Sequence, residues 1–444
     1  MKLKLVALTM SVLGLVSTSA FAADAPAKHK HHHVRKHHHH HHHMQAMAAQ
    51  TDAGYKGALP VVVENCPTSQ YATILDTMDQ NLGRARPTED CNKLIAFAGG
   101  ANFDVHFGNR STNYQGKNLE RFSLNDAYLN IFGNVNDWAK AFASLSYGDP
   151  SGVPTNAIKT GGQYSNVYTN VTQNKVTLEQ GFVRIANFDQ YPVFIQLGKQ
   201  FADFGRYMIH PITRSVTQSL SETLRTSAEL GFIVPMGFHG DVYVFDNPIT
   251  KTGDTHTKTN WGFALGFDNT SDQLGYGVNV GYLYNITGVN DVASLYTAAT
   301  QVATNTTYAT RVSALAVDGM VKSGPFSLVA DYAGALSRLS TADGLLSAAN
   351  GTRGARPWGG NVQAGYAFNA WSRNQNVYVG FQFTGDAVMF NLPKNRWTVG
   401  WNADMWKNTN LGVEIGRDHD YSVAAGGTGR NSGTVGLRAA VQFG

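Results

Sequence analysis

Apolar and polar residues alternate with a period of two through most of the chain after residue 94. In the segment KNRWTVGWNADMW, apolar side chains take the odd positions from Trp397 to Met405, and polar or small ones take the even positions from Arg396 to Asp404. The segments NVYVGFQFTG and GYGVNVGYLY repeat this pattern and carry large aromatics toward the ends of their apolar faces. A period of two predicts β-strands with one apolar face.

Sixteen segments of this kind follow one another. Short turns such as GNVND, VPMG and KSGP alternate with long polar loops over residues 150–173, 203–226, 286–307 and 339–356. This asymmetry is typical of an outer-membrane barrel, which must close because lipid offers no partner to an unpaired strand edge. The predicted strands begin near Leu94, Leu119, Trp138, Asn174, Tyr191, Ser227, Phe238, Lys258, Leu274, Tyr308, Phe326, Trp358, Asn376, Lys394, Asn410 and Arg430.

The predicted fold class is therefore all-β, a transmembrane antiparallel β-barrel of about 16 strands over residues 94–444. An even number of strands places both ends of the barrel domain on the periplasmic side. The barrel follows a short N-terminal helical element, which is described below.

The first residues have the pattern of an export signal. Lys2 and Lys4 precede an apolar stretch over residues 5–16, and the motif AFA at 20–22 marks a cleavage position. An apolar stretch of that length is too short to cross a bilayer as a helix. We predict a cleaved signal peptide over residues 1–22 and location in the bacterial outer membrane.

A histidine-rich stretch follows, HKHHHVRKHHHHHHH at residues 29–43. Lysine, valine and arginine interrupt the run, and it lies behind an export signal, so we interpret it as native rather than as a purification tag. Histidine-rich stretches bind Zn, Ni, Cu or Fe, whereas the alternative is a leader with no specific role. We predict a His-rich disordered leader over residues 23–59, with candidate metal ligands His29, His31, His32, His33, His37, His38, His39, His40, His41, His42 and His43.

Cys66 and Cys91 are the two cysteines of the chain. In an exported protein, such a pair is expected to form a disulfide. We predict a disulfide-stapled periplasmic helical segment over residues 60–93, whose helix either plugs the lumen or docks below it. Its apolar residues recur at helical spacing, at Tyr71, Ile74, Leu75, Met78 and Leu82.

Charge is nearly balanced, with 35 Lys and Arg against 31 Asp and Glu. This balance excludes the strong basic field of a nucleic-acid binder. The partners expected are outer-membrane lipid, a small solute and the barrel-assembly machinery. The sequence leaves homo-oligomerisation open, and we expect no required cofactor.

In a barrel of this size the interior holds water, so inward polar side chains set selectivity. The alternation places Gln180 and Gln382 on inward faces. The alternative for each inward residue is that it only solvates the pore wall. The candidate pore-lining residues on the strands are Arg184, Gln196, Arg396, Asp404, Glu414 and Arg438.

Several segments resemble those of Gram-negative porins. LEQGFVRI, leading into VFIQLGKQFADFGRY, resembles the porin pattern of a strand, a tight turn and a Gly-Lys/Arg-Gln strand that ends near Phe-Gly. GDVYVFDN resembles the strand after the third external loop of phosphate- and carbohydrate-type porins. The last segment, TVGLRAAVQFG, is similar to a terminal assembly signal, but it ends in Gly444 rather than in the aromatic residue.

The general layout of residues 60–444 looks most like the LbtU-type siderophore porins, the legiobactin-receptor family. This resemblance implies a sixteen-stranded barrel without the plug of energised receptors, and traffic of ferric siderophores. The composition itself does not show either property. The function expected is therefore a porin-type channel for small solutes, with ferric siderophore or metal uptake as its specific form.

The third long loop, ADFGRYMIHPITRSVTQSLSETLRT, folds inward and narrows the channel if it behaves as in porins. Arginine forks in it would favour phosphate, carboxylate or hydroxamate groups. The alternative is a lid packed on top of the barrel. The candidate constriction residues are Arg206, His210, Arg214 and Arg225 as cations, opposed by Asp203 and Glu222.

Two other functions compete with a channel. A barrel with a filled lumen would be structural or adhesive, and an outer-membrane hydrolase would need a Ser/His or Asp/His group held close together. Of the histidines after residue 94, His419 in RDHDY is flanked by carboxylates. A single such motif is weak, so we predict that the protein is not an enzyme.

Overall fold

The computed structural model describes Leu75, Met78 and residues 95–109, 119–147, 156–160, 163–167, 176–206, 212–256, 258–270, 274–299, 307–347 and 351–443. The predicted signal peptide, the His-rich leader and the Cys66–Cys91 disulfide lie outside the described residues. Within the described part, no helix is long and apolar enough to cross a membrane.

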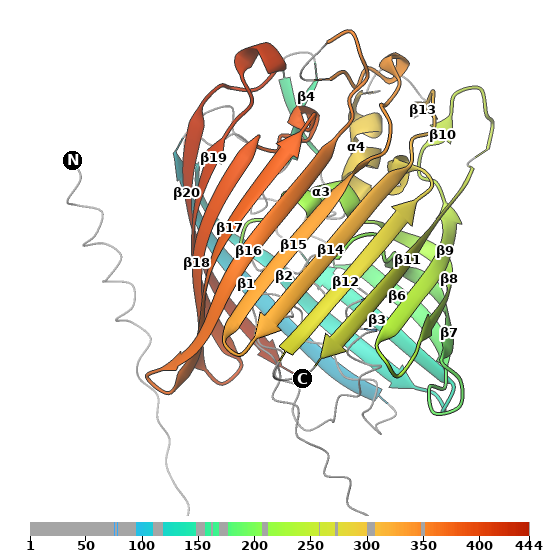
Figure 1. The fold of residues 1–444 in the computed structure, drawn as a ribbon, viewed down its shortest axis with the longest axis vertical. Coiled ribbons are helices and arrows are strands. Elements are labelled where there is room, and N and C mark those ends of the chain that lie inside the picture. Colours follow the sequence, from blue (N-terminus) through green and yellow to red (C-terminus); the bar gives the residue numbers. More distant parts are fainter. Residues whose placement is uncertain are drawn as a thin grey trace, which may run out of the picture. The chain divides into compact units, whose positions relative to one another are not determined.

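Sixteen antiparallel strands form one closed barrel (Figure 1). Each barrel strand pairs with the next one along the chain, and β20 closes the barrel against β1. This confirms the predicted fold class. The strands are β1 (Ile95–Asn109), β2 (Leu119–Asn134), β3 (Ala139–Tyr147), β6 (Thr177–Ala186), β7 (Val193–Phe201), β8 (Leu224–Ile233), β9 (Phe238–Asp246), β11 (Thr259–Thr270), β12 (Leu274–Leu283), β14 (Ala314–Ser323), β15 (Phe326–Ala335), β16 (Trp358–Ala370), β17 (Arg373–Gly385), β18 (Asn395–Trp406), β19 (Thr409–His419) and β20 (Asn431–Phe443).

One predicted strand start is wrong by six residues, and the others lie within three residues of the observed ones. The strand expected near Tyr308 is β14, which begins at Ala314. Tyr308 instead belongs to β13 (Thr307–Tyr308), which pairs in parallel with β10 (Thr250–Lys251) outside the barrel. The reason is that Tyr308 and Val312 are buried in the apolar core of the loops rather than on a strand face.

The two ends of the barrel differ in their connections. At the short-turn end, strands are joined by turns of a few residues, whereas most loops at the long-loop end contain structure of their own. The stretches 150–173 and 286–307, predicted as polar loops, hold a hairpin and a helix. The loop elements are β4 (Asn156–Thr160), β5 (Gln163–Val167), α3 (Val216–Ser221), η2 (Ile286–Gly288), α4 (Asn290–Ala299), η3 (Thr341–Asp343), η4 (Val388–Phe390) and η5 (Val423–Ala425), besides β10 and β13.

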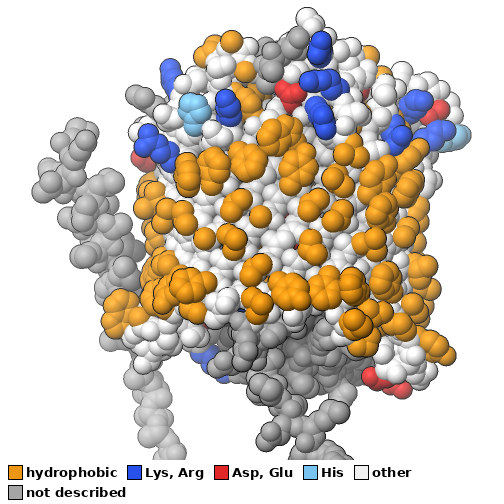
Figure 2. Space-filling model, in the orientation of Figure 1, with side chains coloured by type: hydrophobic (Ala, Val, Ile, Leu, Met, Phe, Trp, Pro, Cys, Tyr) orange, Lys and Arg blue, Asp and Glu red, His pale blue; other side chains and the backbone are white. Residues whose placement is uncertain are grey.

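The outward face of the barrel is apolar. Trp397 is 55% exposed, and Figure 2 shows hydrophobic side chains covering the wall, with Lys and Arg gathered above it. Aromatic pairs lie toward both borders, such as Trp261 with Tyr284 near the long-loop end and Phe326 with Tyr366 near the short-turn end. An apolar band bordered by aromatic rings is the surface that a barrel presents to lipid.

Two of the inward apolar clusters hold loop or helical residues against the wall, and a third joins Phe132, Phe142 and Phe182 of β2, β3 and β6. The larger of the first two fills the long-loop end, where Phe204 and Leu220 pack with Tyr243 of β9 and Val292 of α4. Because these side chains are buried against one another, the loops are held inside the barrel mouth.

The smaller of these two clusters lies at the short-turn end. There the helical residues Leu75 and Met78 pack on Ala186, Phe194 and Ile233. Phe194 lies between the exposed residues of β7, so it points inward. Leu75 and Met78 therefore contact the inner wall of β6 to β8.

Candidate functional site: a strap through the lumen

The described residues 202–206 and 212–223, between β7 and β8, are here called the strap. Its helix α3 contacts β15 and β16, which lie far from β7 and β8 in the order of strands around the barrel (Figure 1). Val216 and Leu220 are fully buried, and a Cβ atom on Gly359 of β16 would lie 3.1 Å from Leu220 Cδ1. The strap therefore crosses the lumen and is not a lid on top of the barrel.

Local sequence explains how the strap turns. The side chain of Ser215 caps α3 by accepting a hydrogen bond from the Gln218 backbone N–H at 3.1 Å. Gly205 adopts φ +81°, and a Cβ there would come within 2.9 Å of Ser221 Oγ and 3.1 Å of Ala316 Cβ. A side chain at Gly205 would thus strain the backbone and collide with β14.

The first end of the strap is held by Arg206, which is 2% exposed. Its Nη1 donates to Asp268 Oδ2 of β11 at 2.9 Å, and its Nη2 lies 3.1 Å from the ring nitrogens of His239. Its backbone N–H donates to Asp318 of β14 at 3.3 Å, and its Nε lies 3.5 Å from Asp203. We call these residues the first anchor.

The middle of the strap, just before α3, is held by Glu414 of β19. Its carboxylate accepts hydrogen bonds from the backbone N–H groups of Ile212 at 3.0 Å and Thr213 at 3.1 Å. The Tyr378 hydroxyl donates to the same carboxylate at 2.8 Å. A buried carboxylate is thus satisfied largely by the strap backbone, which fixes the strap against β19.

Two arginines beside Glu414 are paired in fork geometry. Arg396 donates to both oxygens of Asp418 at 2.7 and 2.9 Å, and Arg438 donates to both oxygens of Asp104 at 2.7 Å. Each also reaches a strap carbonyl at 3.4 Å. We call Glu414, Tyr378 and these two pairs the second anchor. Bidentate pairs of this kind fix orientation as well as charge.

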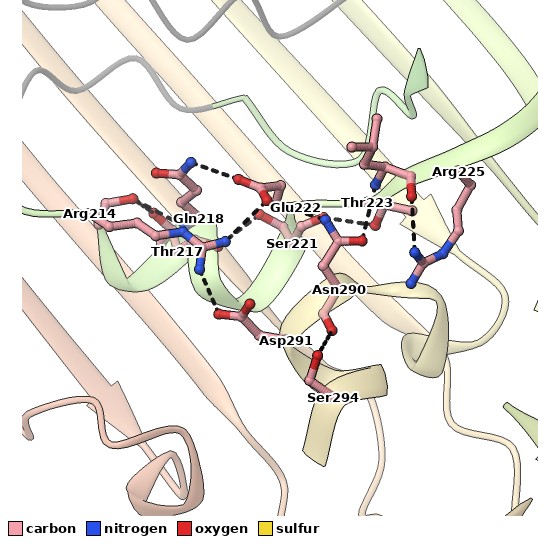
Figure 3. A network of polar contacts seen from close by, with 12 residues as sticks. Arg214, Thr217, Gln218, Ser221, Glu222, Thr223, Arg225, Asn290, Asp291 and Ser294 are labelled. Atoms are coloured by element: carbon pink, nitrogen blue, oxygen red, sulfur yellow. Dashed lines mark hydrogen bonds and ion pairs between the residues drawn. The ribbon is translucent and has the colours of Figure 1, made fainter. Parts of the chain in front are cut away.

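After the second anchor in the chain, α3 is joined to α4 by a polar network (Figure 3). Arg214 contacts Asp291 at 2.8 Å and Glu222 at 3.3 Å, and Gln218 donates to Glu222 at 2.7 Å. Asn290 donates to Glu222 at 3.2 Å. Burial raises the pKa of Asp291 above its usual range, although Arg214 acts in the opposite direction.

The remaining predicted site residues are dispersed. Arg184 is buried on β6 with its guanidinium carbon 5.3 Å from the Phe182 ring centroid, and it lies across from Gln196 of β7. Arg225 belongs to β8 rather than to the loop. His210 lies outside the described residues.

Asp404 is remote from the strap, at the short-turn end. It accepts a hydrogen bond from Asn410 at 3.0 Å beside a cavity of about 360 Å³. The predicted set is thus brought together at the two anchors and at the ends of α3, with Arg184, Gln196 and Asp404 elsewhere on the inner wall.

In the described part of the strap, the arginines expected to act as cations are paired with acids, including Asp203 and Glu222, which were expected to oppose them. Arg206 and Arg214 each contact two carboxylates, because acidic residues from the strap, from α4 and from the barrel wall meet them. Sequence reasoning missed the wall acids, although all occupy buried positions of strands whose alternate residues face inward. These are Glu229, Asp241, Asp268, Asp318 and Asp331, on β8, β9, β11, β14 and β15.

The RDHDY motif does not assemble a catalytic group. Asp418 pairs with Arg396, the Asp420 carboxylate accepts hydrogen bonds from Thr428, and the exposed His419 ring lies 2.7 Å from Asn431. Among the residues that the structure describes, no group of three or more His, Cys, Asp or Glu side chains is placed to hold a metal ion. The predicted His29–His43 ligands lie outside that part.

The chain is similar to proteins that carry no functional name. It is 25% identical over 340 residues to a UPF0422 protein of Coxiella burnetii, which covers 76% of this chain and 67% of the relative. It is 26% identical over 377 residues to UPF0422 protein lpg2959 of Legionella pneumophila, which covers 79% and 66%. The chain thus spans about two thirds of the length of these relatives. No protein-family model matches it.

Among solved structures, the chain is similar to an anion-selective porin from Comamonas acidovorans, with a TM-score of 0.50 at 10% identity, over 79% of this chain and 99% of that one. It is similar to the same degree to OprB of Pseudomonas putida, with a TM-score of 0.50 at 10% identity over 79% and 94%. At this identity the likeness concerns the fold alone. The chain has the sixteen-stranded barrel fold of bacterial outer-membrane porins.

Proposed function

We propose that the protein is an outer-membrane channel in which small polar solutes pass beside the strap. The observation that carries this proposal is the strap itself, pinned to the inner wall at both anchors. A segment that is held across a barrel narrows the aqueous path and presents fixed polar groups to whatever passes.

The polar inner wall supports the same proposal. Neighbouring strands place polar side chains side by side in one row, because each residue of the row pairs across to the next one. A polar inner wall is the interior expected of a porin-type barrel, and the strap backbone is hydrogen-bonded to this row at Asp318, Gln382 and Arg396. The row runs through Asn279, Asp318, Asp331, Asn361, Gln382, Arg396, Asp418 and Ser432.

The finer parts of the proposal rest on the sequence. Ferric siderophore passage follows from the resemblance to the LbtU-type porins, and capture of Zn, Ni, Cu or Fe follows from the His29–His43 run. Export by a cleaved signal peptide, insertion by the barrel-assembly machinery and a homo-oligomeric state complete it. In this proposal no reaction is catalysed.

The test is single-channel conductance of the folded full-length protein in a planar bilayer, with and without a ferric siderophore. We expect discrete ohmic steps, because the path beside the strap is lined by polar groups. Steps blocked by the siderophore would support siderophore passage, and steps indifferent to it would leave a general channel. Absence of steps in protein that runs as a folded barrel would overturn the channel and favour a structural or adhesive barrel.

A further inference from the structure

Two neighbouring carboxyl groups at the first anchor have no hydrogen-bond donor in the part of the chain that the structure describes. Asp203 of the strap is 1% exposed and Asp241 of β9 is 4% exposed. The Asp203 and Asp241 carboxyl groups are neighbours. Among the described residues, no N–H or hydroxyl group donates a hydrogen bond to any of their four oxygens.

Arg206, the cation beside these two carboxyl groups, is paired mainly with another carboxylate. Arg206 donates to Asp268 at 2.9 Å and reaches Asp203 only at 3.5 Å. Glu229 of β8 adds negative charge beside Asp241, and it accepts a hydrogen bond from Gln200 at 2.7 Å. Negative charge at this place therefore exceeds the positive charge that Arg206 supplies.

Two buried carboxylates in contact are strongly unfavourable unless a proton or a cation lies between them. A proton would satisfy one of the four oxygens as a donor, whereas a metal cation would bind several of them at once. Oxygen atoms are the ligands of hard cations such as Ca²⁺ and Mg²⁺, and these ions also take backbone carbonyls and water.

We propose that Asp203 and Asp241 bind a hard, oxygen-liganded metal cation that links the strap to the barrel wall. Because no third acidic or histidine side chain in the described part joins them in a metal-holding group, the two carboxylates are the charged ligands and neutral oxygens complete the shell. The cation would neutralise the buried carboxylates of the first anchor and fix the strap there. At the second anchor, the two backbone N–H groups that donate to Glu414 fix the strap in the same way. This proposal does not depend on whether the protein conducts ions as the proposed channel would.

The test is binding of Ca²⁺, Mg²⁺ and K⁺ to the full-length protein, refolded in detergent without lipopolysaccharide and freed of metal with a chelator. Calorimetric titration and thermal unfolding, each with and without the ion, provide two readouts. The His29–His43 run does not interfere, because imidazole prefers Zn, Cu or Ni over these hard ions. We expect one site, a higher unfolding temperature with the ion, and at least roughly tenfold weaker binding in Asp203→Asn and in Asp241→Asn.

The matched control is Asp246→Asn, since Asp246 is an exposed aspartate on the same strand as Asp241. It should bind like wild type. Wild-type protein that binds none of the three ions and unfolds identically in chelator would overturn the proposal, even if both variants fail to fold. If both variants bind each ion as wild type does and are equally stable, the two carboxyl groups share a proton rather than a metal ion. That outcome also overturns the proposal.

Discussion

The two anchors of the strap are built differently. At the second anchor every buried charge meets its counterpart: Arg396 pairs with Asp418, Arg438 pairs with Asp104, and Glu414 accepts two backbone N–H groups and a hydroxyl. At the first anchor, one guanidinium lies among carboxylates from the strap and four strands. Those carboxylates are Asp203, Glu229, Asp241, Asp268 and Asp318.

This difference separates a structural attachment from a site. A set of buried groups that satisfies itself holds a segment in place and has no need of a ligand. A set with surplus charge is stable only with a further partner, so the first anchor is where we expect a ligand to change the position or stability of the strap.

The largest effect is expected for Arg206→Met at the first anchor. The substitution keeps much of the side-chain volume but leaves Asp268 and Asp203 without their cation, and breaking a buried pair in this way costs about 3–5 kcal/mol. Urea unfolding of the detergent-folded barrel, followed by tryptophan fluorescence, measures the loss.

Arg373→Met is the matched control, because Arg373 is exposed at the start of β17. Its free energy of unfolding should stay within about 0.5 kcal/mol of wild type. Equal losses in the two variants would show that the first anchor contributes nothing particular, and the contrast between the anchors would disappear.

A smaller effect is expected for Glu414→Gln at the second anchor. The amide keeps one acceptor for the strap but loses the charge, so one or two charge-assisted hydrogen bonds weaken, at about 1.5–3 kcal/mol each for those to charged groups. The barrel should remain folded while residues 212–213 loosen, which limited proteolysis within the strap and noisier single-channel steps would detect.

Tyr378→Phe, which removes one donor to the same carboxylate, should fall between Glu414→Gln and wild type. A larger loss in Tyr378→Phe than in Glu414→Gln would contradict the assignment of Glu414 to the strap backbone.

The wall of the barrel could be predicted from sequence because a period of two is a local property. Val399 and Trp401 alternate with Thr398 and Gly400, so one strand shows which side chains meet lipid. The same rule failed at Tyr308, because an apolar residue in a loop that folds into a core has the same local signal as one on a strand face.

The sequence predicted which side chains of the site face inward but not which residues they contact. Alternation placed Arg438 and Glu414 on inward faces, but their partners Asp104 and Ile212 lie hundreds of residues away in the chain. Such pairs depend on barrel closure and on the path of the strap, neither of which a local pattern contains. The wall acids that meet Arg206 could not be predicted for the same reason, since they come from distant strands.

The smallest effect is expected in the polar network that joins α3 to α4, for Asp291→Asn on α4. Burial raises the pKa of Asp291, so the folded state holds a proton at pH values where the unfolded chain has released it. The contribution of this group to stability is therefore complete below the unfolded pKa, about 3.9, and declines as the pH rises through the folded value.

The asparagine of the variant cannot titrate, and Arg214 keeps Glu222 as a partner at 3.3 Å. We expect the variant to match wild type within about 1 kcal/mol in acid and to gain on it as the pH rises toward neutrality, in urea titrations at several pH values. A variant that becomes progressively less stable than wild type as the pH rises would mean that attraction to Arg214 outweighs desolvation, and α4 would then be a third balanced attachment like the second anchor.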